Sequence, residues 1–408
     1  MANTNQMPMR GARRILVMSI LGALTAFGPF TIDTYLPSFP SLVEAFETTD
    51  SAIQLTLAGT MGGFAVGQLV AGPWSDRVGR KWPLLAGCAV HVAASLAVAA
   101  SGDLLQFFVA RVFQGFGAAA AAVVAMAMVR DLFSGYSMVR ALSLVALVSG
   151  FAPLIAPVVG SQILAFADWH GIFVFLAGYA FLMLLCCLLL PDSLPRDTRS
   201  AGTRVSWLAR YRRVLSDRSF IGLMVMGGMR FTALFAYLQA SPFLLQRELG
   251  LTPQEYGVTF AVITLGMMTG VQSSSRLARF IPVRAILLSS LGCVAAAGVL
   301  VAVSAPLGWG VGAVIVVFVL FMVGCGLGLP MIQSLALLDH PDEAGTAAAL
   351  IGASSFGAAA LFSPLVGLTT TAGLGEAVGL GVVFLLTSVV GAIALFALVG
   401  PTRSFARR

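Results

Sequence analysis

Long apolar runs alternate with short polar turns along the whole chain. Each run has the length of a membrane-spanning helix, which needs about 20 mainly apolar residues because backbone groups find no water in lipid. Twelve runs lie at residues 15–37, 52–73, 83–100, 104–129, 138–165, 171–190, 219–241, 256–275, 285–304, 310–334, 344–369 and 377–399. The pattern predicts an all-α membrane protein with twelve transmembrane helices.

The runs fall into two sets of six that resemble each other. A polar, basic stretch at residues 191–218 separates an N-terminal unit (1–190) from a C-terminal unit (219–408). Three residues of the fifth run recur 207 positions later in the eleventh; they are Gly150, Pro157 and Gly160, matched by Gly357, Pro364 and Gly367. Duplicated bundles are typical of secondary transporters. We therefore expect two pseudo-symmetric six-helix bundles joined by a basic linker.

The basic residues give the orientation. Of the 24 Lys and Arg, all except Arg111, Arg230 and Arg247 lie in the two tails, in the linker, or in turns and span ends on the same side as the tails. Cytoplasmic loops of membrane proteins carry an excess of Lys and Arg. We expect both termini to face the cytoplasm.

Composition excludes several other classes of protein. With 58% hydrophobic and 10% charged residues, the chain has too few charges for a water-facing surface, which needs about a quarter. The net charge of +7 forms no basic stripe interleaved with aromatic residues, so a nucleic-acid partner is not expected. The five cysteines lie in apolar runs without metal-ligand spacing. No nucleotide loop, catalytic triad or metal cluster occurs, so neither an enzyme nor a cofactor is expected.

Three charged residues fall deep inside the runs: Asp33, Arg111 and Arg230. Each would cost about 2.5–3.5 kcal/mol at a helix centre in lipid, so each is expected to face a watery cavity or a partner. Asp33 and Arg111 lie at similar depth and can meet if their helices are neighbours. As the only acid within the runs, Asp33 is the natural proton carrier. The alternative is a fixed Asp33–Arg111 ion pair that joins two helices.

Arg230 has no acidic partner in the C-terminal runs. One interpretation is that it binds an electronegative group of a substrate or frees a proton-linked carboxylate. The other is that it caps backbone carbonyls at a helix break near Gly227 and Gly228. His91, the one histidine of the third run, is expected to be a hydrogen-bonded packing residue.

A charged turn at Gly72–Lys81 stands between the second and third runs. Gly72 and Gly79 permit a tight turn, and Asp76 can accept hydrogen bonds from amides at a helix N-terminus. Arg80 can reach Asp131, which follows the fourth run at the same surface.

The fifth run carries small or helix-weakening residues on one face, namely Gly150, Pro153, Pro157 and Gly160. Such a face lets helices approach closely and flex, here against the eighth run. We expect this helix to act in gating rather than in binding.

Four motifs together resemble the major facilitator superfamily, and within it the Bcr/CflA group of twelve-span drug:proton antiporters. They are Ile32–Pro40, Gly72–Lys81, Arg111–Ala119 and Gly150–Gly160. The resemblance implies that the first, fourth, seventh and tenth spans line a central cavity. The predicted cavity residues are Asp33, Tyr35, Arg111, Gln114, Arg230, Phe235 and Gln239, with Asp33 and Arg111 coupling to protons.

The resemblance also implies that the charged turn acts as a latch between the two halves in the outward-open state. The predicted latch consists of Gly72, Asp76, Arg77, Gly79, Arg80, Lys81 and Asp131. The alternative is a turn that only fixes topology.

The resemblance implies a proton-coupled exporter of small drugs or toxins, such as amphenicol-like or bicyclomycin-like compounds. It would work as a monomer by alternating access in the bacterial inner membrane, with the substrate, protons and the bilayer as its partners and no cofactor besides the proton gradient. A proton-coupled importer of a small nutrient and a non-transporting receptor on the same fold are the alternatives. The motif in the fifth run favours export.

Overall fold

A computed structural model describes residues 12–194, 207–338, 340, 343–371, 373 and 375–399. Every regular element in these ranges is helical, as the sequence predicts. The N-terminal bundle contains α1 (Ala12–Thr25), α2 (Phe27–Asp33), η1 (Leu36–Ser38), α3 (Phe39–Ala45), α4 (Asp50–Val78), α5 (Lys81–Ala99), α6 (Leu104–Leu132), α7 (Gly135–Ile163) and α8 (Trp169–Leu188).

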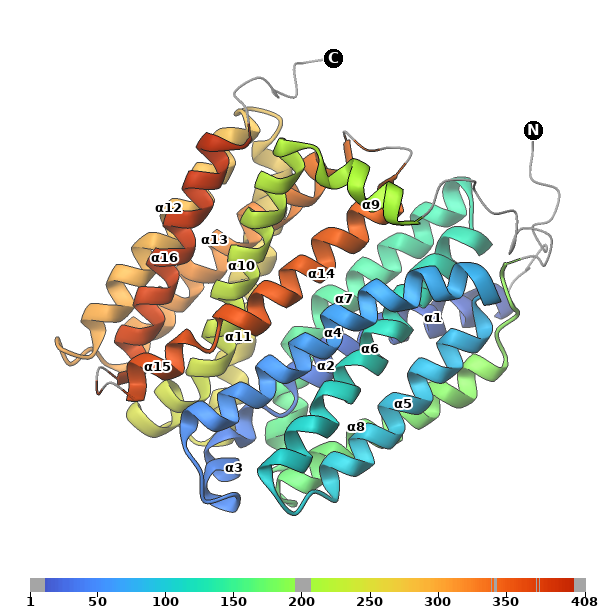
Figure 1. Cartoon of the computed structure of the whole chain (residues 1–408). Coiled ribbons are helices and arrows are strands. Elements are labelled where there is room, and N and C mark those ends of the chain that lie inside the picture. The colour runs from blue at the N-terminus through green and yellow to red at the C-terminus, as the bar shows by residue number, and fades with distance from the viewer. Residues whose placement is uncertain are drawn as a thin grey trace.

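The C-terminal bundle repeats this arrangement (Figure 1). It contains α10 (Arg218–Pro242), the π-helical η3 (Phe243–Glu248), α11 (Pro253–Leu277), α12 (Val283–Ser304), α13 (Val311–Leu338), α14 (Ala344–Phe362), α15 (Leu365–Thr371) and α16 (Gly375–Ala397). The linker helix α9 (Trp207–Leu215) packs against α10 and α14.

Each predicted span corresponds to one helix or to one interrupted helix. Eleven helical segments among the described residues are long and apolar enough to cross a membrane. The remaining predicted span is α11, a helix of 25 residues that does not meet this criterion. Its Thr, Ser and Gln residues lower its hydropathy.

Three boundaries differ from the prediction. The first span does not end at residue 37, because the helical path breaks after Asp33 and then continues to Ala45. The second span runs through Gly72 and Pro73 to Val78. The eleventh span breaks before Pro364, which lacks the backbone N–H that a continuing helix needs.

Close backbone contacts hold each bundle together. A Cβ atom at Gly63 of α4 would overlap the carbonyl oxygen of Val112 on α6. The equivalent contact in the second bundle places Gly270 of α11 against the carbonyl oxygen of Val323 on α13. Lipid provides little hydrophobic drive between helices, so small residues that allow this approach stabilise the packing.

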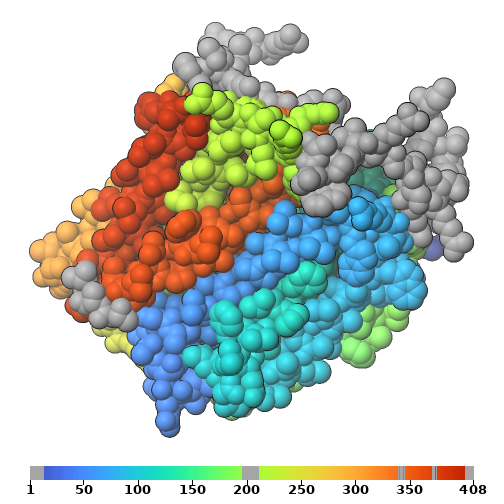
Figure 2. All heavy atoms as spheres, viewed as in Figure 1, coloured from blue at the N-terminus to red at the C-terminus, as the bar shows by residue number. Residues whose placement is uncertain are grey.

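The two bundles meet where α4 packs against α14 and α7 packs against α11. Figure 2 shows α14 seated along α4 on one face of the molecule. We call the end of the interface near α9 and the turn at Gly79 and Arg80 the linker side. The opposite end, near α3, η3 and α15, is called the far side (Figure 1).

Candidate functional site

Arg111 is fully buried in the N-terminal bundle, on α6. Its Nη1 donates hydrogen bonds to the carbonyl oxygen of Thr31, at 3.0 Å, and to Oε1 of Gln114. Its guanidinium carbon lies 3.9 Å from the centroid of the Tyr35 ring. A carbonyl, an amide and an aromatic face therefore hold this charge in place of a carboxylate.

The break in the first span explains this arrangement. Because α2 ends at Asp33, the carbonyl of Thr31 belongs to the last helical turn, where carbonyl groups lack intrahelical partners. An arginine on the neighbouring helix supplies the missing donor. The contact between Thr31 and Arg111 confirms that Arg111 on the fourth span lies at the same membrane depth as the end of α2 on the first span, as predicted.

Asp33 is 5% exposed and forms no ion pair with Arg111. The alternative prediction of a fixed ion pair between these residues is therefore wrong. Nη1 of Arg111 donates instead to the Thr31 carbonyl and to Gln114, and its Nε and Nη2 are buried without a hydrogen-bond partner. The short helix η1, which follows Asp33 closely in the chain, packs against α10 and α11 of the C-terminal bundle. Asp33 therefore lies close to the interface of the two bundles.

A hydrogen-bonded network extends from Arg111 to the third span. Nε2 of Gln114 donates to Oγ of Ser95 at 2.7 Å. Ser95 in turn lies 3.3 Å from Nδ1 of His91, whose Nε2 lies 2.8 Å from Oγ1 of Thr31. His91 is thus a buried, hydrogen-bonded residue as predicted, and it belongs to the network that positions Arg111.

Phe235 and Gln239, both on α10, lie at the interface as well. The Phe235 ring packs against Phe356, which stacks on Phe64 of the other bundle with a centroid distance of 5.0 Å. Nε2 of Gln239 donates to Oγ of Ser363 at 2.7 Å, while its Oε1 is buried without a hydrogen-bond partner.

Arg230 lies inside the C-terminal bundle. Its Nη2 donates to Oγ of Ser290 on α12 at 2.7 Å and lies close to Gly328 of α13. Helix α10 is continuous through Gly227 and Gly228, so the predicted helix break that Arg230 would cap does not exist. The structure separates Arg230 from the network around Arg111.

A cavity of about 530 Å³ opens between the bundles on the linker side. Thr25, Gln68 and Met126 contribute to one wall, and Glu343 and Thr346 to the other. None of the seven predicted cavity residues lines it, and all seven are buried in this conformation. The sequence predicted a cavity that reaches Asp33. In the structure the far side is closed at the depth of Asp33, so the cavity does not extend to this residue.

The far side is closed by direct contacts between the bundles. A Cβ at Gly257 of α11 would lie 2.5 Å from Oγ of Ser161 on α7. Gln254 donates through Nε2 to the carbonyl oxygen of Ser161 at 3.0 Å. The part of α7 that contains Pro157 and Gly160 therefore packs against α11, as the sequence predicts.

The two repeated glycines differ in what they contact. Within the N-terminal bundle, a Cβ at Gly160 would overlap the carbonyl oxygen of Thr34. Gly367, 207 positions after Gly160, accepts a hydrogen bond at its carbonyl oxygen from Oγ of Ser51, at 3.0 Å. Arg247 of η3 forms an ion pair with Asp50 of α4. Gly367 thus lies where the halves touch, whereas the contact of Gly160 with Thr34 lies within one half. Gly150 lies elsewhere, and a Cβ added to it would meet nothing within 4 Å.

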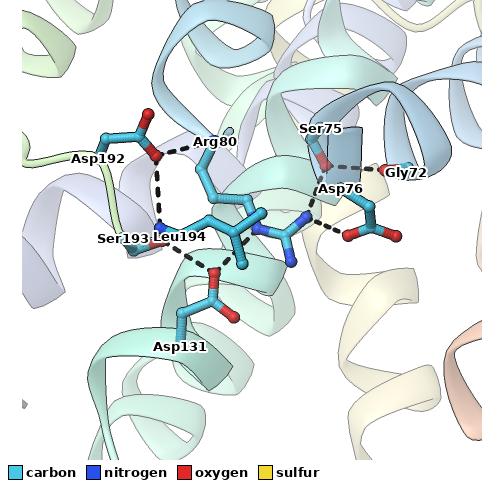
Figure 3. Close-up of polar contacts among 8 residues, drawn as sticks. All are labelled: Gly72, Ser75, Asp76, Arg80, Asp131, Asp192, Ser193 and Leu194. Carbon is cyan, nitrogen blue, oxygen red and sulfur yellow. Dashed lines mark hydrogen bonds and ion pairs between the residues drawn. The ribbon is translucent and has the colours of Figure 1, made fainter. Parts of the chain in front are cut away.

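Arg80 is the centre of a polar cluster on the linker side (Figure 3). Its Nε donates to Oδ2 of Asp131 at 2.9 Å, and its Nη1 donates to Ser75 and Asp76. Its backbone N–H donates to Oδ1 of Asp192 at 2.9 Å. The predicted reach of Arg80 to Asp131 is confirmed.

Two details of the predicted turn are wrong. Gly72 lies inside α4, and only Gly79, with a φ of 99°, supplies the turn conformation that other residues rarely adopt. Asp76 binds the Arg80 side chain, while Asp192 accepts the hydrogen bond from the amide that precedes α5. Of the remaining predicted latch residues, Arg77 is exposed and Lys81 donates to the carbonyl of Leu188.

Burial lowers the pKa of Arg80, but the hydrogen bond and charge of Asp131, followed by those of Asp76, outweigh it and raise the pKa overall. Arg80 therefore stays charged throughout the physiological range. Its hydrogen bonds among the described residues all go to the N-terminal bundle or to the segment directly after α8. In this conformation the cluster joins helices within one half.

Replacing Asp131 with Asn should destabilise the protein more than replacing Asp76 with Asn. The Asp131 side chain is 21% exposed and that of Asp76 is 65% exposed. Weakening a largely buried charged hydrogen bond costs about 1–3 kcal/mol, whereas a screened surface pair contributes below about 1 kcal/mol. Thermal unfolding of the two purified variants in detergent measures the difference. Equal midpoints would show that Asp131 does not hold Arg80.

Sequence reasoning missed Gln54, Asp192 and Glu376. Asp192 is the first acidic residue after the sixth run, and that position alone was a usable signal. Gln54 and Glu376 lie at the far-side ends of their runs and are hydrogen-bonded to each other across 322 residues of sequence. No local pattern indicates such a contact.

The family assignment follows from a profile of the Major Facilitator Superfamily, which matches residues 18–364. The chain belongs to the major facilitator superfamily. It is a multi-pass membrane transporter of this family and not an enzyme. The resemblance inferred from the four motifs is confirmed.

Curated relatives of this superfamily protein include transporters named for drug resistance. It is 34% identical over 395 residues to the uncharacterized MFS-type transporter YdgK of Bacillus subtilis, covering 95% of this chain and 96% of the relative. It is 30% identical to a bicyclomycin resistance protein homolog of Haemophilus influenzae, covering 85% and 87%. It is 28% identical to the multidrug resistance protein MdtL of Shewanella oneidensis, covering 83% and 85%.

Solved structures confirm the major facilitator fold. A mutant form of the nucleoside transporter NupG aligns with a TM-score of 0.77 at 13% identity, over 95% of this chain and all of that one. The xylose transporter XylE from E. coli, in a partially occluded inward open conformation, aligns with a TM-score of 0.75 at 14% identity, over 97% and 98%. At these identities the similarity concerns the fold.

Proposed function

We propose that this transporter exports small, partly apolar drugs or toxins across the bacterial inner membrane in exchange for protons. The observation that carries the proposal is Asp33, a buried carboxyl group near the interface of the halves that is not paired with Arg111. A buried carboxyl that no arginine neutralises is stabilised by a proton or by a cationic or hydrogen-bonding substrate. The names of two relatives, which refer to bicyclomycin resistance and multidrug resistance, support the substrate class.

In the proposed cycle the linker side faces the cytoplasm, because it carries most of the Lys and Arg. Both termini then lie in the cytoplasm, and the cavity on the linker side admits the drug. The drug and a proton compete for Asp33, so protonation from outside releases the drug after the halves have rocked. One charge that crosses 100 mV contributes about 2.3 kcal/mol to this exchange.

The proposed roles of the other residues follow from this cycle. Arg111, held by Thr31, Gln114 and Tyr35, keeps a fixed positive charge near Asp33 and favours release of its proton once the site faces the cytoplasm. The Arg80 cluster is the proposed latch, which would engage the facing wall at Glu343 when the linker side closes. The protein would act as a monomer.

Transport in everted membrane vesicles tests this proposal. Energised vesicles that contain the protein should accumulate a labelled amphenicol or bicyclomycin-like compound, and an uncoupler should release it. Adding the same compound to weakly buffered, detergent-solubilised protein should release protons. Uptake of a labelled sugar or amino acid by intact cells instead of drug extrusion would favour the importer, and the absence of any transport would favour the receptor.

A further inference from the structure

A groove of about 670 Å³ lies between α1 and α7 of the N-terminal bundle. All the residues that line it belong to these two helices, and none of them lines the cavity between the bundles. The helices touch deeper in the membrane, where a Cβ at Gly22 would lie 3.6 Å from Cγ2 of Val148 and Oγ of Ser149 donates to Oγ1 of Thr25 at 3.2 Å. The groove therefore opens between the linker-side parts of α1 and α7, apart from the transport pathway.

One arginine from each helix lines the groove: Arg14 of α1 and Arg140 of α7. Each lies about two helical turns, or about 12 Å, to the linker side of the residue of its own helix that makes the close contact, so the two charges lie at similar depth. Neither takes part in an ion pair of the described residues. Helices α1, α7 and the adjoining α8 contain no Asp or Glu, and Asp131, which precedes α7, is engaged by Arg80. Two positive charges thus share a groove to which the surrounding helices bring no acid.

Apolar side chains form the rest of the groove. They are Ile15 and Met18 on α1, and Leu144 and Leu147 on α7. Ile15 is 61% exposed and Leu147 is 56% exposed, although both are large and apolar. In a membrane protein such side chains lie against lipid chains, because lipid tails are as apolar as the side chains themselves. The groove therefore joins a charged end at the linker-side surface to an apolar wall within the membrane.

A phospholipid with a net negative charge has the chemistry that fits both ends of the groove. Guanidinium groups donate paired hydrogen bonds to phosphate, and the hydroxyl groups of Ser19 and Ser143, which also line the groove, can donate to the phosphate or the headgroup. Basic grooves between transmembrane helices are typical sites for anionic lipid headgroups. A zwitterionic lipid brings a cationic group, which two neighbouring arginines repel. The charges therefore favour an anionic lipid over a zwitterionic one.

We propose that this groove is a binding site for one anionic phospholipid of the leaflet on the linker side. The phosphate lies between Arg14 and Arg140, and an acyl chain follows the apolar wall toward the contact between Gly22 and Val148. The bound lipid joins the linker-side parts of α1 and α7 and so stabilises the N-terminal bundle. The inference does not depend on which substrate the protein transports.

Native mass spectrometry of the delipidated, full-length protein in detergent tests this inference. Titration with phosphatidylglycerol should fill one tight site. Its dissociation constant should be about fivefold or more below that of phosphatidylcholine with the same acyl chains, because each basic residue near an anionic lipid is worth about one such factor. Since a ligand of the folded state stabilises it, phosphatidylglycerol should also raise the thermal unfolding midpoint more than phosphatidylcholine does.

Three variants separate the groove from general surface charge. The double variant Arg14→Gln, Arg140→Gln should weaken phosphatidylglycerol binding about 25-fold and leave phosphatidylcholine binding unchanged. Arg279→Gln removes an exposed arginine from the turn after α11, in the other bundle, and should bind both lipids as the wild type does. Leu147→Trp keeps both arginines but fills the groove, so it should weaken phosphatidylglycerol binding. Because Leu147 is exposed, this variant provides a second test if the double variant does not fold.

Equal affinities for the two lipids, or unchanged phosphatidylglycerol binding in the double variant, would overturn the inference. Unchanged binding in Leu147→Trp would show that the arginines act only as surface charge, which also overturns it. Displacement of the bound lipid by millimolar inorganic phosphate would assign the arginines to free phosphate instead. A selective site in a protein that exports no drug would contradict the proposed function and leave the inference standing.

Discussion

Replacing Asp33 with Asn should abolish drug accumulation against a gradient while leaving downhill movement of the drug. The proton gradient then has no carboxyl group through which to act. With about 2.3 kcal/mol per 100 mV lost, the drug gradient that cells sustain should fall by about 50-fold. Drug accumulation in energised everted vesicles, with and without an uncoupler, measures the change.

The fold should tolerate this substitution. Asp33 is buried, and Asn has nearly the same shape without the cost of burying a charge. The thermal unfolding midpoint in detergent should therefore stay the same or rise, which separates lost coupling from lost structure. Asp103→Asn is the matched control, because Asp103 is an exposed N-cap of α6 where Asn caps equally well. Full uphill extrusion by Asp33→Asn would exclude Asp33 as the coupling residue.

Replacing Gly160 with Ala should destabilise the N-terminal bundle and impair transport. The added Cβ would overlap the backbone carbonyl of Thr34 in the same half, and a backbone carbonyl cannot rotate away as a side chain can. Overpacking of this kind costs up to about 3 kcal/mol of folding free energy. The thermal unfolding midpoint in detergent should fall. Drug accumulation in energised everted vesicles should fall with it, because α7 also packs against α11 of the other half.

The same helix provides the control for Gly160→Ala. Gly150→Ala changes a residue of the same predicted gating face, but nothing lies within 4 Å of its added Cβ. Ala is the better helix former by about 0.5–1 kcal/mol, so this variant should transport normally and be slightly more stable. Loss of activity in both variants would indicate that α7 must bend, and that the contact with Thr34 is not the determining feature.

Gly150 and Gly160 also show where sequence reasoning reached its limit. Their spacing, with Pro153 and Pro157, correctly indicated a small-residue face that packs against the eighth span. Spacing did not distinguish Gly160, which touches Thr34, from Gly150, which touches nothing. That difference depends on where the first span breaks, and the sequence interpretation had that span continue unbroken to residue 37.

The charged residues give a similar lesson. Hydropathy alone identified Asp33, Arg111 and Arg230 as charges that need an explanation within the membrane. The pairing that charge alone favours, Asp33 with Arg111, is not the one that forms, because Arg111 instead donates to a carbonyl at the end of α2. Arg230 was placed in the cavity, whereas the rotation of α10 directs it to Ser290.

Composition and the local hydrophobic pattern were enough to predict the twelve helical spans, their duplication, the family and the residues whose charge is costly in lipid. They could not predict which residues meet: Arg111 with Thr31, Asp192 with Arg80, and Gln54 with Glu376. Such pairings depend on helix breaks, on rotation about helix axes and on how the two halves close, and these arise from packing between distant segments.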